Sequence, residues 1–174
     1  MQLRHFFAGL ALSASVVVLS SCENTGTIAG GGADSNYSVA RQALENGNYN
    51  VAIRGYQNLL GRMSPGTASR IELEYAHSLL RANRFDEAIE VANRLTQQPD
   101  NSIRASALAV RGTAQHEAAR KMIASGQHNI RVRQLLEGAQ ADLAAFLHVH
   151  SSLDAGGAMR ARSQIIASDL LPVD

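Results

Sequence analysis

The side chains of this 174-residue chain that could perform chemistry are six histidines, one cysteine and a cluster of carboxylates. A helical zinc site needs a second histidine four positions after the first, and Arg120 occupies that position after His116. His148 and His150 are two positions apart and would point about 200° away from each other on a helix. The sequence has no Gly-x-Ser-x-Gly turn that could present a nucleophilic serine. It therefore predicts no metal, no other cofactor and no catalytic centre.

Three carboxylates, Asp86, Glu87 and Glu90, lie in the first turns of a predicted helix. Carboxylates at this place stabilise the positive N-terminal end of the helix dipole. Stabilisation of the helix explains them better than acid–base catalysis does. We therefore expect a protein that is not an enzyme.

The cysteine lies at the end of an apolar N-terminal segment. Arg4 and His5 give a short basic start, and residues 6–19 are mostly apolar. As a helix this stretch would be about 21 Å long, which is short of the ~30 Å hydrocarbon core of a bilayer. The pattern is typical of a signal peptide, which we predict over residues 1–21 and expect to be absent from the mature chain.

The sequence Leu19-Ser20-Ser21-Cys22 resembles the lipobox of bacterial lipoproteins. The resemblance implies that Cys22 is the first residue of the mature chain and carries a covalent lipid, which acts as a membrane anchor. A lone cysteine in an exported protein also has no disulfide partner. By the sorting rules of enterobacterial lipoproteins, Glu23 implies the outer membrane. The alternative is an ordinary signal peptide followed by a chance cysteine or a buried thiol.

Residues 22–35 contain several glycines and few bulky apolar side chains. The run Gly30-Gly31-Gly32 is not followed by the Lys-Ser/Thr pair of a phosphate-binding loop. We therefore expect the lipidated Cys22 and a flexible tether over this range. Such a tether would let the following domain move roughly 20 Å from the bilayer.

Beyond the tether, apolar residues recur at helical spacing and repeat every 36 positions. The matched pairs are Tyr49 with Phe85, Ala52 with Ala88, Ile53 with Ile89 and Leu59 with Leu95. Ahead of each stripe, Ala40, Ala76 and Gly112 follow the same interval. Gly47-Asn48 and Asn83-Arg84 lie between the paired segments, where a left-handed residue and an N-cap suit a tight turn. The repeated unit is therefore predicted to be a helix, a tight turn and a second helix.

These positions resemble the tetratricopeptide repeat family, whose period is 34 residues. The match runs through Ala40-x3-Leu44-x2-Gly47-x-Tyr49-x2-Ala52-Ile53-x2-Tyr56-x2-Leu59-Leu60 and through Ala76-x2-Leu79-Leu80-x4-Phe85-x2-Ala88-Ile89-x5-Leu95-x3-Pro99. The resemblance implies an all-α fold in which antiparallel helix pairs stack as a short right-handed solenoid. We expect this domain over residues 36–168 and a C-terminal tail over residues 169–174.

The third unit is irregular. Its first helix is predicted over residues 102–124, and the pattern of a second helix returns at 139–147. Because Ala88 and Ala139 are 51 positions apart, 15 more than the period, we place an insertion of about 15 residues near 125–133. A last helix at about 155–168 is expected to cover the exposed end of the stack.

In tetratricopeptide repeats the first helix of each unit lines a concave groove, which implies a set of partner-binding residues here. The expected residues are Tyr37, Arg41, Glu45, Arg70, Leu73, His77, Leu80, Arg81, Ala109, Thr113, His116 and Glu117. Arg41, Arg70 and Arg81 would form a cationic strip suited to a peptide carboxylate or to an acidic, partly hydrophobic segment. The alternative is that these arginines only solvate an exposed face.

The charge balance argues against nucleic-acid binding, and the resemblance implies a scaffold at the outer membrane. Lys+Arg 16 against Asp+Glu 15 gives a net charge of +1, which makes the chain a poor partner for nucleic acid. Residues 107–112 and 141–147 resemble the β-barrel assembly lipoproteins of the outer membrane (BamD type), and the size resembles the pilus lipoproteins of the tight-adherence (TadD) or pilotin kind. Both imply a non-catalytic scaffold at the outer membrane that faces the periplasm and binds an envelope protein or peptide segment. A regulator of a cell-wall enzyme is a further alternative.

Overall fold

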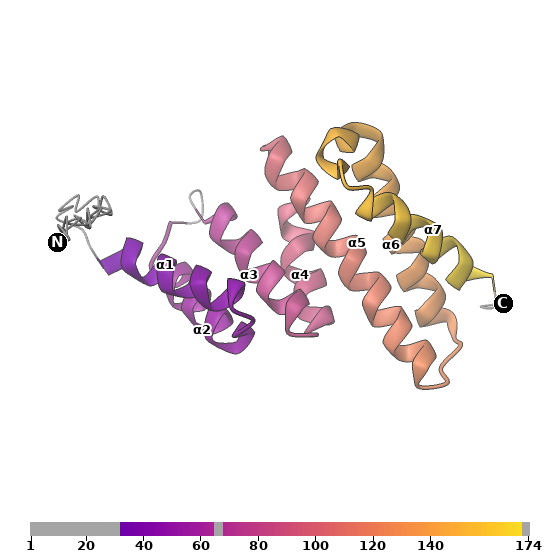
Figure 1. Cartoon of the computed structure of the whole chain (residues 1–174), viewed down its shortest axis with the longest axis horizontal. Coiled ribbons are helices and arrows are strands. Elements are labelled where there is room, and N and C mark those ends of the chain that lie inside the picture. The colour runs from indigo at the N-terminus through magenta and orange to yellow at the C-terminus, as the bar shows by residue number, and fades with distance from the viewer. Residues whose placement is uncertain (1–31, 65–67, 172–174) are drawn as a thin grey trace, which may run out of the picture.

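The computed structural model describes residues 32–64 and 68–171, with side chains from Ser35 onward, and these residues form a stack of helices (Figure 1). The helices are α1 (Gly32–Glu45), α2 (Tyr49–Leu60), α3 (Ser69–Arg81), α4 (Phe85–Leu95), α5 (Asn101–Ala124), α6 (Ile130–His150) and α7 (Ala158–Leu170), with a 3-10 helix, η2 (Ser151–Asp154), before α7. No strand occurs within these described ranges. Each helix packs on the next one along the chain. The prediction of an all-α, tetratricopeptide-like solenoid is confirmed.

Most of the N-terminal predictions lie outside the described residues: the signal peptide over 1–21, Cys22 with Glu23, and the tether as far as residue 31. The start of α1 at Gly32 differs from the prediction, because positions 32–35 were expected to belong to the tether. No bulky apolar side chain precedes Tyr37 in this turn, so apolar periodicity carries no signal there. Of the expected tail, residues 172–174 lie outside the described part of the chain.

The three helix pairs, α1/α2, α3/α4 and α5/α6, turn in the same way. A residue with positive φ follows the first helix of each pair: Gly47 (77°), Asn83 (59°) and Gly126 (76°). The next backbone N–H bonds back into the helix, as in Asn48 N to Ala43 O at 2.8 Å and Arg84 N to Leu79 O at 3.0 Å. This is the hydrogen-bonding pattern of a Schellman C-cap. Asn48 occupies the predicted N-cap position, but its side chain makes no capping bond.

The small residues at the 36-position interval lie where paired helices touch. A Cβ added to Gly55 on α2 would lie 2.7 Å from the Cβ of Ala40 on α1. In the third pair, a Cβ on Gly112 would come within 3.1 Å of Asp142 on α6. Because these distances leave no room for a larger side chain, the short residues set how closely each pair can pack.

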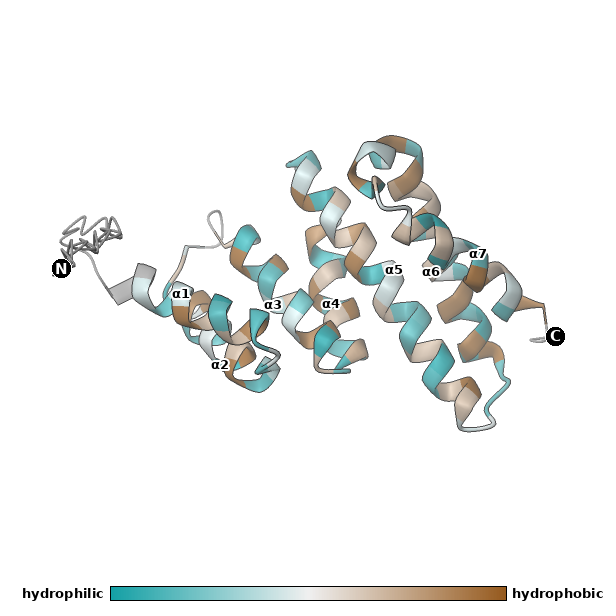
Figure 2. Cartoon of the chain, viewed as in Figure 1, coloured by the Kyte–Doolittle hydropathy of each residue, from teal (hydrophilic) through white to brown (hydrophobic). Residues whose placement is uncertain are grey.

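The core runs along the whole described stack in three joined clusters. One cluster lies between α1 and α2, a second spans α2 to α5, and a third spans α5 to α7. Tyr75 packs against the first two clusters and Ile89 against the last two. Figure 2 shows the corresponding alternation of apolar and polar segments along the helices. This continuity is what a stack of repeats requires, since a single pair cannot bury its apolar side alone.

The expected insertion near 125–133 is not a long loop. Instead α5 and α6, of 24 and 21 residues, are longer than α3 and α4, of 13 and 11, and only residues 125–129 connect them. The side chain of Asn129 caps α6 by accepting from Arg131 N (3.1 Å) and Val132 N (3.2 Å). The extra residues therefore lengthen both helices, and the end of this hairpin reaches past the α3–α4 turn (Figure 1).

The last helix, α7, covers the end of the stack as predicted, within slightly shifted bounds. Its Ile166 is buried in the cluster that α5 and α6 form. The buried Asp154, just ahead of α7, accepts from Met159 N (2.9 Å) and Arg160 N (3.1 Å). These bonds lower the pKa of the Asp154 carboxyl, with the Met159 N–H as the largest cause. They also fix the position at which α7 begins.

Candidate functional site: a groove between α3, α5 and α7

Two adjoining hollows lie between α3, α5 and α7, and we call them together the groove. The polar hollow, of about 510 Å³, is lined by Tyr49, His77, Leu80, Arg81, Asn83, Phe85, Ala109, Val110, Thr113, Glu117, Met159 and Arg162. The apolar hollow, also of about 510 Å³, is lined by Leu73, Glu74, His77, Ser106, Ala109, Val110, Phe146, Leu153, Asp154, Gly156, Ala158 and Met159. Four residues, His77, Ala109, Val110 and Met159, belong to both. The hollows thus form one continuous surface.

Seven of the twelve residues predicted to bind a partner line this groove. They are Leu73, His77, Leu80 and Arg81 on α3, and Ala109, Thr113 and Glu117 on α5. Helical spacing brings them together, because residues three and four apart share one face. The opposite wall is α7, which contributes Met159 and Arg162.

The four predicted residues Tyr37, Arg41, Glu45 and Arg70 line neither hollow. The ring of Tyr37 packs 6.3 Å from that of Tyr56 in the core of the first pair. The guanidinium of Arg41 donates to Glu45 at 2.7 Å. The structure therefore assigns these side chains to packing and surface ion pairs.

The predicted cationic strip is not formed, because Glu45 and Glu74 together compensate two of its three arginines, Arg41 and Arg70. Glu74 Oε1 lies 2.8 Å from Arg41 Nη1 and 3.9 Å from Arg70 Nε. Its side chain is only 12% exposed, so these ions are less screened than a fully exposed pair would be. The bond to Glu45 is the largest cause that raises the pKa of Arg41, and the charge of Glu74 adds to it.

Arg81 is the member of the strip that faces the polar hollow without a carboxylate. Its Nε and Nη2 donate to Tyr49 Oη at 3.2 and 2.9 Å, and its guanidinium lies 5.4 Å from the centre of the Tyr49 ring. Among the described residues no acidic side chain pairs with it. Arg81 is thus a positioned cation whose neighbour is neutral.

His116 was predicted to face the groove, and this prediction is wrong. Its side chain is 1% exposed and lies between α5 and α7, with Nε2 3.0 Å from Asp169 Oδ2 and Nδ1 3.0 Å from Arg162 Nη1. Because a guanidinium can only donate, Nδ1 must accept, and the proton of the neutral ring is on Nε2. Burial lowers the pKa of His116, and the bond to Asp169 opposes this. His116 therefore connects α7 to the stack.

Arg162 joins that buried connection to the groove. Its Nη1 also lies 2.6 Å from Glu117 Oε1, which lines the polar hollow with it. The charges of Arg162 and Glu117 therefore compensate each other across the α5–α7 boundary.

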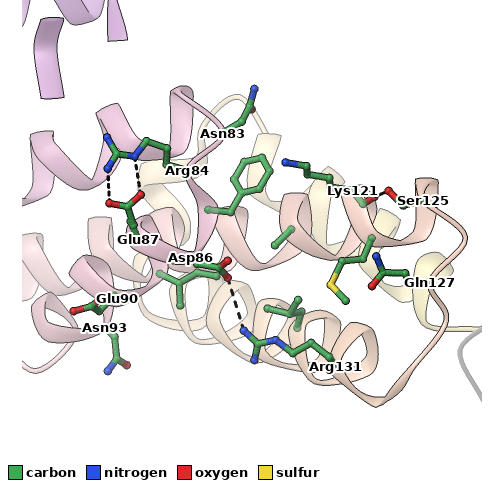
Figure 3. A pocket seen from close by; sticks show the side chains of 15 residues that line it. Asn83, Arg84, Asp86, Glu87, Glu90, Asn93, Lys121, Ser125, Gln127 and Arg131 are labelled. Carbon is green, nitrogen blue, oxygen red and sulfur yellow. Dashed lines mark hydrogen bonds and ion pairs between the residues drawn. The ribbon is translucent and has the colours of Figure 1, made fainter. Parts of the chain in front are cut away.

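A third hollow, of about 820 Å³, lies outside the groove between α4 and the extended ends of α5 and α6. Figure 3 shows two of the ion pairs at its rim: Arg84 with Glu87, and Asp86 with Arg131, whose Nη2 and Oδ1 atoms are 3.9 Å apart. Asp86 and Glu87 lie in the first turn of α4, as the helix-dipole argument predicted. Arginines on either side thus pair with two of the carboxylates at this hollow.

No three His, Cys, Asp or Glu side chains gather as a metal site within residues 32–64 and 68–171. No helix of the same residues is both long and apolar enough to span a bilayer.

Several side chains that shape the groove carried little signal in the sequence. Glu74 could have been found from its i,i+4 spacing to Arg70. Met159 and Arg162 come from α7, where no repeat register extends. Phe146 lies in the second-helix pattern of the third unit, but it was not among the residues predicted to line the groove. The packing of α7 against the stack is a tertiary contact that the apolar periodicity of the sequence does not predict.

A family model described as tetratricopeptide repeat matches residues 43–111 of the chain. The matched range runs from the end of α1 to the middle of α5 and includes all of the second helix pair. No curated protein and no solved structure gives a significant match. The repeat interval and the stacked helix pairs agree with this match: residues 43–111 match the tetratricopeptide repeat family, and the described part of the chain has a tetratricopeptide-like helical fold.

Proposed function

We propose that this protein is a non-catalytic scaffold that binds a protein or peptide segment in the groove and is held at the outer membrane by a lipid on Cys22. The single observation that carries the binding role is the continuous groove, with the uncompensated Arg81 at one hollow and apolar side chains in the other. Tetratricopeptide repeats generally bind protein partners, which supports the same role. No bound cofactor other than the lipid enters the proposal.

The anchor is supported by the sequence alone. A basic start, an apolar stretch and Leu-Ser-Ser-Cys are arranged as in bacterial lipoproteins. Two or more acyl chains would anchor the protein stably where a single chain would not. The proposal places the groove in the periplasm, at the service of an envelope assembly or secretion machine such as a pilus system. A component of barrel assembly and a regulator of a cell-wall enzyme are the alternatives.

Site-specific photocrosslinking in cells tests the binding role. A photoreactive residue at Thr113, inside the polar hollow, should capture one protein partner. The same residue at Arg54, an exposed position on α2 outside both hollows, is the matched control. Equal capture from both positions, or no capture from Thr113, would reject the groove as the binding surface.

The identity of the captured protein separates the alternatives. A secretin or another pilus component would support the pilus role, a barrel-assembly subunit the second role, and a cell-wall enzyme the third. Mass spectrometry of the mature N-terminus tests the anchor independently. An acylated Cys22 is expected, together with loss of outer-membrane fractionation in Cys22→Ser, and an unmodified or missing Cys22 would refute the anchor.

A further inference from the structure

We infer that the groove selects a peptide segment with one carboxylate and one bulky apolar side chain about 12 Å apart, the carboxylate binding Arg81 and the apolar side chain entering the apolar hollow. This inference rests on the proposed groove function and adds the chemistry of the partner. The charge of the polar hollow predicts the carboxylate, the surface of the apolar hollow predicts the apolar side chain, and the length of α3 between the two hollows predicts their separation.

The polar hollow carries one positive charge in excess. Its ionic side chains are Arg81, Arg162 and Glu117, and the last two pair with each other at 2.6 Å. Arg81 donates through Nε and Nη2 to the neutral Tyr49 hydroxyl, and the described contacts leave its Nη1 available to a ligand. A carboxylate would complement this charge by a charge-assisted hydrogen bond. A positive ligand group would instead be repelled.

The Tyr49 contacts also hold the Arg81 guanidinium in one place before a ligand arrives. Two hydrogen bonds and the ring 5.4 Å away restrict a side chain that would otherwise occupy many rotamers. A ligand that binds a positioned cation does not have to order it.

The apolar hollow offers no uncompensated charge. Its Glu74 pairs with Arg41 and Arg70, and its Asp154 is buried and bonded to the first amides of α7. The remaining surface is mostly apolar, with contributions from Leu73, Val110, Phe146, Leu153 and Met159. Leu153 is 63% exposed although it is a large apolar side chain. An apolar ligand side chain would remove this surface from water.

The spacing follows from α3, which contributes to both hollows. Leu73 and Arg81 are eight positions apart on this helix. At a rise of 1.5 Å per residue, their Cα atoms are about 12 Å apart along the helix axis. An extended peptide covers that distance in about four residues at roughly 3.3 Å each. A helical ligand would need about eight.

Synthetic peptides test this specificity on the full chain purified in detergent. Each fluorescent probe contains one Glu and one Leu in a Ser/Gly background, separated by one to eight positions, and binding is measured by anisotropy. The tightest binding is expected at a separation of about four for an extended ligand or about eight for a helical one. Replacement of the peptide Leu by Ser should weaken binding on the order of tenfold. Replacement of the Glu by Gln should weaken it about two- to fivefold.

Protein variants assign the peptide carboxylate to its partner. In Arg81→Gln, the Glu and Gln peptides should bind equally, whereas in the control Arg54→Gln their difference should persist. Equal binding at every separation, the same Glu-to-Gln effect in Arg81→Gln, or no binding up to about 1 mM peptide would overturn the inference. If a cellular partner still crosslinks at Thr113 in that case, the groove function stands and only this ligand chemistry fails. Absence of that crosslink would reject the function itself.

Discussion

Acidification from about pH 7.5 to about pH 5.5 should lower the free energy of unfolding of this protein through His116. Both ring nitrogens are occupied, Nδ1 by an N–H of Arg162 and Nε2 by a carboxylate oxygen of Asp169, each at 3.0 Å. A second proton, on Nδ1, would place two N–H groups against each other. The other charges near the ring form two pairs of opposite sign, so they largely offset one another. Glu117 pairs with Arg162, and Arg120 lies 3.8 Å from Asp169.

The sign and the upper limit of the effect follow from proton binding. Burial is the largest cause that lowers the pKa of His116 in the folded chain, and Arg162 lowers it further, against the bond to Asp169. The unfolded chain has the ordinary histidine pKa of about 6.5. Near and below that pH the unfolded state binds a proton that the folded state does not, so stability falls as the pH falls. One proton limits this contribution to about 1.4 kcal/mol per pH unit.

Urea unfolding at a series of pH values measures the effect. His116→Gln keeps an N–H donor near Asp169 but cannot be protonated, so its free energy of unfolding should depend less on pH than that of the parent chain. His128→Gln, at an exposed position in the 125–129 connection, is the matched control and should keep the parental slope. If His116→Gln and the parent chain show the same slope between about pH 5.5 and 7.5, the assignment of the neutral, doubly bonded ring is wrong.

Three further changes test the packing. In thermal unfolding, Gly55→Ala should destabilise the first helix pair by about 1–3 kcal/mol, because the added methyl group overpacks the contact with α1. Gly61→Ala is the control and should be neutral or slightly stabilising, because its added Cβ would lie an ordinary 3.6 Å from the nearest atom and its φ is −62°. Asp142→Ala should cost about 1–3 kcal/mol in urea unfolding, because it removes the carboxylate partner of Arg111, which keeps its hydrogen bonds to Asn93 and Thr96. The added change Arg111→Met should recover part of this loss, and a larger loss in the double variant would contradict the reasoning. Tyr56→Phe should leave the stability measured by calorimetry unchanged or raise it by about 1 kcal/mol, because the buried Tyr56 hydroxyl has no hydrogen-bond partner within the described residues. A clear loss of stability would mean that the hydroxyl is hydrogen-bonded.

The sequence was sufficient to predict the helix pairs because each has one apolar stripe and a glycine or asparagine at its turn. Tyr49 and Phe85 begin α2 and α4, and Gly47 and Asn83 take the left-handed conformation at the turns before them. Local patterning and tertiary packing therefore agree in the first two units.

The third unit could be predicted less well, because α5 is packed on more than one side. Its buried residues, among them Ala105, Ala114 and His116, do not follow a single stripe, since α4, α6 and α7 all contact it. Carrying the groove register along α5 led to Thr113, which lines the groove, and also to His116, which α7 covers. An insertion inferred from a broken period likewise gives no indication of whether the added residues form a loop or extend two helices.

The placement of α7 links the end of the stack to ligand binding. Through Met159 and Arg162 it is a wall of the groove, and through Ile166 it covers the last apolar face. A ligand that contacts this wall would raise the free energy of local opening of α7 by RT ln(1 + [L]/Kd). Protease resistance of the C-terminal segment would therefore measure how much of the groove is occupied. A chain cut after residue 154 would lose its terminal cover and the α7 wall of the proposed binding groove together, so truncation phenotypes would not distinguish a folding defect from a binding defect.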